Sequence, residues 1–123
     1  MSEYISGACN IGPAEIKRRK QSAYLGGALY LVVAILLIAT NASSTTRLWV
    51  FLPAMLFAIG YIQSKRKFCV AYGFLGIFNF DKLGSTTKIK LNQDLKTDRK
   101  YAIKLMVQAL LLAIVLTALI AII

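Results

Sequence analysis

Two cysteines carry most of the reactive chemistry that this sequence offers. Cys9 and Cys69 are its only thiols, and Cys69 follows closely on the basic cluster Lys65–Lys67. Nearby lysine or arginine side chains favour the thiolate, which is the nucleophile in sulfur transfer. Neither cysteine has a histidine or a carboxylate beside it in the sequence. The competing interpretation is that both are small, semi-buried apolar residues, since a structural disulfide is disfavoured on a reducing, cytoplasmic face.

The remaining composition offers little for catalysis. The chain contains no histidine, which removes the commonest general base and the usual haem and copper ligands. Its acids are too few for a carboxylate-rich metal or proton site, and they are Glu3, Glu15, Asp81, Asp94 and Asp98. No nucleophile–base pair, metal-ligand cluster or phosphate-binding loop is recognisable in the sequence. We therefore expect a protein that is not an enzyme, binds no metal and has no cofactor of its own, bound lipids apart.

Three apolar segments must position these side chains. Hydrophobic residues make up 58% of the 123 residues, yet the net charge is +10. This combination is typical of a membrane protein whose basic flanks alternate with apolar spans, and it disfavours a nucleic-acid partner. We predict an all-α integral membrane protein with three transmembrane helices, at about residues 23–40, 47–64 and 103–123. Each is close to the roughly 20 residues that a helix needs to cross a bilayer.

These spans divide a single membrane domain, residues 1–123, into four parts. Residues 1–22 form an N-terminal segment, and residues 23–64 form a helical hairpin. Residues 65–102 form a connector, and residues 103–123 form the third span. The charged stretch Asp94–Lys100 of the connector is interpreted as a solvated or headgroup-facing surface.

One uncharged segment of the connector, Phe68–Phe80, needs a separate explanation. It is too short to span a bilayer, and it lacks the basic face that would hold it on a membrane surface. We predict an interfacial or re-entrant segment at residues 68–80 that is covered by protein, either by Asn10–Arg19 or by a partner. Cys69 would then lie where these pieces meet.

The basic residues predict the orientation. Fourteen of the fifteen lysines and arginines fall on one side of the three predicted spans, and only Arg47 falls on the other. The positive-inside rule therefore places the N-terminus in the cytoplasm and the C-terminus outside. Anionic headgroups are expected to contact the basic residues that flank the spans, at about 1 kcal/mol each. These residues are Lys17, Arg18, Arg19, Lys20, Lys65, Arg66 and Lys67.

Two short blocks flank the predicted hairpin, NIGPAEIKRR before it and CVAYGFLGI after it. Together they resemble the YgaP-like transmembrane domain family, whose members are small bacterial and archaeal inner-membrane hairpins that are sometimes fused to a rhodanese. The matching residues are Asn10, Gly12, Glu15, Arg19, Cys69, Tyr72, Gly76 and Ile77.

The chain also departs from the family pattern. Ile16 replaces an arginine and Val70 replaces a proline, while the third span and Cys9 have no counterpart in the minimal domain. The resemblance covers about residues 9–79. It implies the inner (plasma) membrane of a prokaryote, with both blocks on the cytoplasmic face. Its one functional implication is a link with sulfur-transfer domains.

Three functions follow from these patterns. We predict a small non-catalytic accessory subunit that stabilises a larger membrane complex by packing against other membrane subunits. Small residues four apart let helices approach closely, and the pairs are Ala23 with Gly27 and Ala54 with Ala58. The first alternative is a thiol or sulfur relay that uses Cys9 and Cys69. The second is a small transporter component, which is disfavoured because the apolar runs of the three spans, residues 23–40, 48–62 and 105–123, contain no charged residue.

Overall fold

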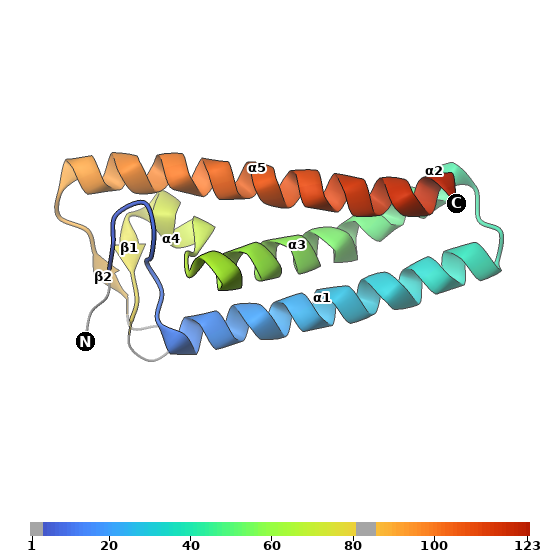
Figure 1. The fold of residues 1–123 in the computed structure, drawn as a ribbon, viewed down its shortest axis with the longest axis horizontal. Helices are drawn as coiled ribbons and strands as arrows, with labels where there is room; N and C mark the ends of the chain where they lie inside the picture. The colour runs from blue at the N-terminus through green and yellow to red at the C-terminus, as the bar shows by residue number, and fades with distance from the viewer. Residues whose placement is uncertain (1–3, 81–85) are drawn as a thin grey trace.

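The computed structural model describes residues 4–80 and 86–123, which are mostly helical (Figure 1). Three long helices lie side by side, and a short helix and a two-stranded sheet lie at one end of them. In chain order the elements are α1 (Pro13–Ala39), α2 (Ser44–Arg47), η1 (Leu48–Val50), α3 (Phe51–Arg66), α4 (Val70–Leu75), β1 (Ile77–Phe78), β2 (Thr87–Lys88) and α5 (Asn92–Ile122).

Three helical stretches are long and apolar enough to cross a membrane, which confirms that part of the prediction. They are Pro13–Ala39, Ser44–Arg66 and Asn92–Ile122. Two of them begin well before the predicted spans at residues 23 and 103, because polar helix precedes the apolar part in both α1 and α5. The small antiparallel sheet of β1 and β2 adds an element that the all-α prediction did not contain.

The start of α1 follows from two neighbouring residues. Gly12 is the N-cap with an extended backbone, and Pro13 occupies the first helical position, where its missing N–H costs no hydrogen bond. The helix continues without a break into the apolar part, which begins at Ala23. Glu15 and Arg19 therefore lie one and two turns into a rigid helix, and their positions are fixed relative to that apolar part.

Small residues make the contacts between the long helices. Gly26 and Gly60 lie at the crossing of α1 and α3, and an added Cβ on either would collide with the backbone of the other helix. The core between α3 and α5 consists of alanines, namely Ala54, Ala58, Ala109 and Ala113. Ala23, Ala54 and Ala58, which were predicted to pack helices, are thus buried within the chain itself.

Large apolar side chains have the opposite distribution. Tyr24, which is 75% exposed, and many leucines, isoleucines and valines of α1 and α5 point outward. A water-soluble helical protein buries such residues and leaves polar ones outside. Small residues inside and large apolar residues outside are the arrangement that suits helices surrounded by lipid.

Arg47 stabilises the end of the bundle where the chain turns from α1 into α3. Its guanidinium donates to the carbonyl of Ala42 at 3.0 Å and to the carbonyl of Ile120, in the last turn of α5, at 3.1 Å. The last carbonyls of a helix have no partner within it and carry its negative dipole end. Within residues 4–80 and 86–123, Arg47 is the one basic residue at this end of the bundle, and it completes a helix terminus.

At the other end, Asp98 of α5 anchors the N-terminal segment. Its carboxylate is fully buried and accepts hydrogen bonds from the Tyr4 hydroxyl and the Gly7 N–H, each at 2.7 Å. The prediction of a solvated surface over Asp94–Lys100 is therefore wrong at Asp98. The N-terminal turn covers this side chain, whereas Lys96 and Lys100 are exposed.

The crossing of α1 and α3 gives a test of the packing with two adjacent glycines. Gly26→Ala would place a Cβ 2.8 Å from Phe57 Cα, so we expect a loss of stability of about 1–3 kcal/mol. Gly27→Ala is the matched control, because its Cβ would meet only the Phe57 ring at an ordinary 3.4 Å. Thermal unfolding of both variants in detergent measures the difference. Equal midpoints for the two variants would contradict the close crossing.

Candidate functional site

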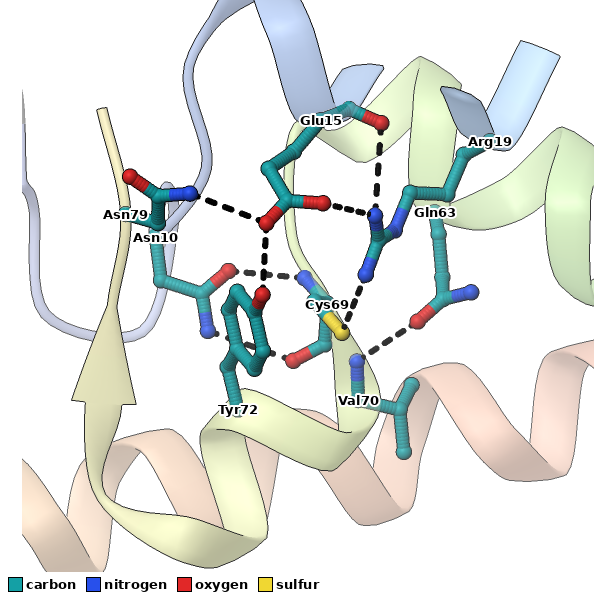
Figure 2. Close-up of polar contacts among 8 residues, drawn as sticks. All are labelled: Asn10, Glu15, Arg19, Gln63, Cys69, Val70, Tyr72 and Asn79. Carbon is teal, nitrogen blue, oxygen red and sulfur yellow. Dashed lines mark hydrogen bonds and ion pairs between the residues drawn. The ribbon is translucent and has the colours of Figure 1, made fainter. Parts of the chain in front are cut away.

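A cluster of polar side chains lies at the end of the bundle that holds α4, and it joins two segments far apart in the sequence (Figure 2). One segment is the start of α1 with the residues before it, and the other runs from the end of α3 to the residue after β1. We call these side chains the polar cluster, and they are Asn10, Glu15, Arg19, Gln63, Cys69, Tyr72 and Asn79.

Asn10 binds the backbone of Cys69 at both of its polar groups. Its side-chain oxygen accepts from the Cys69 N–H at 2.7 Å, and its side-chain nitrogen donates to the Cys69 carbonyl at 3.2 Å. The backbone N–H of Asn10 donates to Lys67 at 3.1 Å, and its carbonyl accepts from Asn79 at 2.9 Å. Because Asn10 is fully buried, these bonds give each of its polar groups a partner in place of water.

Gly12 continues this contact toward α1. Its N–H donates to the Asn79 carbonyl at 2.8 Å, and an added Cβ would lie 2.9 Å from the backbone of Phe80. Only glycine therefore allows the two strands of chain to lie this close. This requirement gives a structural reason for the Asn-x-Gly spacing at the start of the first block.

Glu15 is the centre of the cluster and is 1% exposed. It lies before the apolar part of α1, and its carboxylate accepts from the Tyr72 hydroxyl at 2.5 Å and from the Asn79 amide at 2.9 Å. It also forms an ion pair with Arg19 on the next turn, as the four-residue spacing predicts. Burial raises the pKa of Glu15, but the hydrogen bonds and the arginine outweigh it, and the net pKa is lowered.

Tyr72 presents its hydroxyl from α4 to the carboxylate of Glu15. Burial raises the pKa of Tyr72 to about 12, with the hydrogen bond to Glu15 and the negative charge of that residue acting in the same direction. The ring of Tyr72 lies under the guanidinium of Arg19, 5.6 Å from the ring centre to Cζ. Two contacts therefore hold the Tyr72 side chain in place, one between its ring and the Arg19 cation and one between its hydroxyl and Glu15.

Arg19 connects the carboxylate to the thiol. One guanidinium nitrogen contacts Glu15, and the other donates to Cys69 Sγ at 3.0 Å. Cys69 is 3% exposed and precedes the first residue of α4. A cationic donor at sulfur is the setting of many reactive thiols, but burial at this level blocks the approach of a second reactant.

Cys9 occupies a different setting from Cys69. It is partly exposed, and its thiol donates to the carbonyl of Ile11 at 3.7 Å. Both cysteines are thiols in this structure and do not form a disulfide. Asn10, the neighbour of Cys9, binds the backbone of Cys69, so the two cysteines belong to segments that are directly hydrogen-bonded.

Two members of the cluster were missed in the sequence. Gln63 accepts from the Val70 N–H at 2.7 Å, which satisfies a donor at the start of α4, and Asn79 donates to Glu15. Both are buried. A usable signal was present, since each is an amide within or next to a largely apolar run. Buried amides of this kind are retained when they satisfy backbone groups or charges.

The remaining predicted residues lie around the cluster. Lys17, Arg18, Lys20, Lys65, Arg66 and Lys67 are exposed, whereas Arg19 points into the cluster and not toward solvent. Gly76 ends α4 in a left-handed conformation at φ 74°, which favours glycine. Among the described residues, no group of three or more His, Cys, Asp or Glu side chains lies close enough to hold a metal ion.

Comparison of this protein with family models, curated proteins and solved structures gives no match. The resemblance to the YgaP-like transmembrane domain family therefore stays a prediction from the two blocks. The structure brings residues of both blocks into contact, through Asn10 with Cys69 and through Glu15 with Tyr72.

Removing one hydroxyl tests how far the cluster stabilises the fold. Tyr72→Phe would leave the buried carboxylate of Glu15 without one of its donors, so we expect a loss of about 1.5–3 kcal/mol. Tyr24→Phe is the control, because it removes the same hydroxyl from an exposed side chain. Unfolding of both variants in the same detergent gives the comparison. A Tyr72→Phe protein as stable as the control would show that the contact contributes nothing.

Proposed function

We propose that α1, the stretch Ser44–Arg66 and α5 span a prokaryotic inner membrane, with the polar cluster on the cytoplasmic side. The outward large apolar residues and inward small residues of these helices support this placement. The charges support the orientation. Exposed lysines and arginines surround the end that holds the cluster, while Arg47 at the opposite end binds helix carbonyls.

We further propose that the protein is a non-catalytic accessory subunit of a larger membrane complex. The observation that carries this proposal is a group of apolar side chains exposed outside the apolar parts of the long helices. Leu75 and Leu91 are 69% and 65% exposed, and Phe74 beside Leu75 is also exposed. A hydrogen bond from Ile89 to Gly76 brings their two segments together. Exposed apolar groups of this kind mark contact surfaces.

The polar cluster supports a structural role for the cytoplasmic end. Its buried side chains are engaged in hydrogen bonds with one another or with the backbone of the same chain. Cys69, the one nucleophile in the cluster, is buried. A polar network whose groups are all hydrogen-bonded rigidifies the segments that it joins. Here it would hold Phe74, Leu75 and Leu91 in a fixed arrangement on the surface.

Co-purification tests the subunit proposal. Leu75→Ser with Leu91→Ser should reduce the amount of partner protein retained in mild detergent by tenfold or more, because each leucine would lose its buried contact. Lys90→Ser with Lys96→Ser is the control, since it changes two exposed residues of the same region to the same side chain. Retained proteins are identified by mass spectrometry. A monodisperse particle of monomer size from native membranes would contradict the proposal.

A second candidate function, thiol or sulfur transfer, is supported by one contact. The hydrogen bond from Arg19 to Cys69 Sγ is the kind of interaction that stabilises a thiolate during sulfur transfer. The link of the resembling family with rhodanese domains points the same way. For this function Cys69 must become accessible, so the covering residues Asn10–Arg19 would have to move.

Thiol labelling separates the two candidates. In the folded protein, we expect a maleimide to react with Cys69 at least tenfold more slowly than with Cys9, because Cys69 is buried and Cys9 is not. Cys9→Ser and Cys69→Ser variants allow each rate to be measured alone, and unfolding in SDS gives the reference rates. Rapid labelling of Cys69 that Arg19→Gln slows would favour sulfur transfer over the subunit role.

A further inference from the structure

A groove runs along the outer surface between α1 and α3. It has two parts of about 490 Å³ each, which share Ala23, Tyr24 and Phe57 as lining residues. Each part is within the range of about 300–1,000 Å³ that is typical of small-molecule sites. The two parts adjoin at the shared residues, and together their lining reaches from Lys20 and Lys65 to Leu31 of α1 and Leu116 of α5.

The inner part of the groove is almost wholly apolar. Gly27 and Ala28 of α1 line it, and Leu31 lies further along the same helix. Gly27 has no side chain and Ala28 has one carbon, which leaves the space that a larger residue would fill. Because this part follows the apolar portion of α1, its depth corresponds to the hydrocarbon core in the membrane placement proposed above.

The outer part of the groove has a basic rim. Lys20 from α1 and Lys65 from α3 both line it, and both are exposed. Lys65 donates to the Tyr61 hydroxyl at 3.3 Å and lies 5.6 Å from the centre of the Tyr61 ring, which directs it toward the groove. Among the described residues, neither lysine is paired with an acidic side chain. The two charges are available to an anionic ligand.

We propose that this groove binds one anionic phospholipid. An acyl chain would lie along Ala23, Gly27 and Ala28, and the phosphate would lie between Lys20 and Lys65. The order of the lining, two cations followed by an apolar channel, matches the order of chemical groups in such a lipid. An extended protein segment is a poorer match, because it would bring unpaired backbone polar groups into the apolar part. This inference depends on the proposed membrane placement and not on the subunit role.

Native mass spectrometry of the full chain in mild detergent tests the inference with two lipids. Phosphatidylglycerol should bind at one molecule per chain and at least tenfold more tightly than phosphatidylcholine of the same acyl chains. Lys20→Gln with Lys65→Gln should remove this preference, since each lysine near a headgroup contributes several-fold. Lys88→Gln with Lys90→Gln is the control, because it removes two exposed charges that neither line the groove nor belong to the basic residues that flank the spans.

A second pair of variants tests the apolar part. Ala28→Trp should fill the groove and weaken binding of phosphatidylglycerol at least tenfold, whereas Leu29→Trp, an exposed residue that does not line the groove, should leave it unchanged. Equal binding of the two lipids, equal effects of the two lysine pairs, or full binding by Ala28→Trp would each overturn the inference.

Extraction of membranes with alkaline carbonate separates this result from the placement on which it depends. Release of the protein into the soluble fraction would refute the membrane placement. Retention in the membrane together with no lipid preference would refute the groove alone. Failure to find a protein partner would leave the lipid measurements unaffected, because these use the isolated chain.

Discussion

The burial of one carboxylate constrains the whole end of the fold that holds α4. Glu15 is almost fully removed from solvent, and a buried charge is tolerated only where a counter-charge and hydrogen-bond donors surround it. Arg19, Tyr72 and Asn79 meet that requirement from α1, from α4 and from the residue after β1. Three segments must therefore meet at one point. The segment Phe68–Phe80, apolar but unable to span a bilayer, is held there by its two polar side chains and by the backbone of Cys69.

The same constraint extends along the long helices. The helix α1 is continuous from Pro13 to Ala39. The position of Glu15 in the polar cluster therefore also determines the position of Gly26 along the helix axis, where it lies next to Phe57 of α3. The alanines between α3 and α5 allow the third helix to pack closely against the second. Helices in lipid are not driven together by the hydrophobic effect. Close packing of this kind is what stabilises their association there. The polar cluster thus determines how the long helices are aligned along their axes, and the small residues determine how closely these helices pack.

The features that could be predicted are those that depend on residues close together in the sequence. Hydropathy predicted three apolar helices. The uncharged Phe68–Phe80 was predicted to be covered by protein, either by Asn10–Arg19 or by a partner. The burial of Asp98 was not predictable in this way, because its donors come from Tyr4 and Gly7, more than ninety residues away. Small residues on a helix likewise indicate a close contact without identifying the neighbouring helix. Here the neighbouring helix belongs to the same chain. The four-residue spacing of small residues is therefore weak evidence, by itself, for packing against another subunit.

Arg19 also decides how the two candidate functions relate. The guanidinium that contacts Cys69 Sγ is the counter-charge of the buried Glu15. Any reaction that drew Arg19 toward a sulfur-bound anion would weaken the pairing of that carboxylate, and exposing Cys69 would break the bonds that Asn10 makes to its backbone. Sulfur chemistry at this thiol is therefore coupled to opening of the cluster. A structural role does not require the cluster to open, because the contacts that Arg19 makes in the closed cluster already stabilise it.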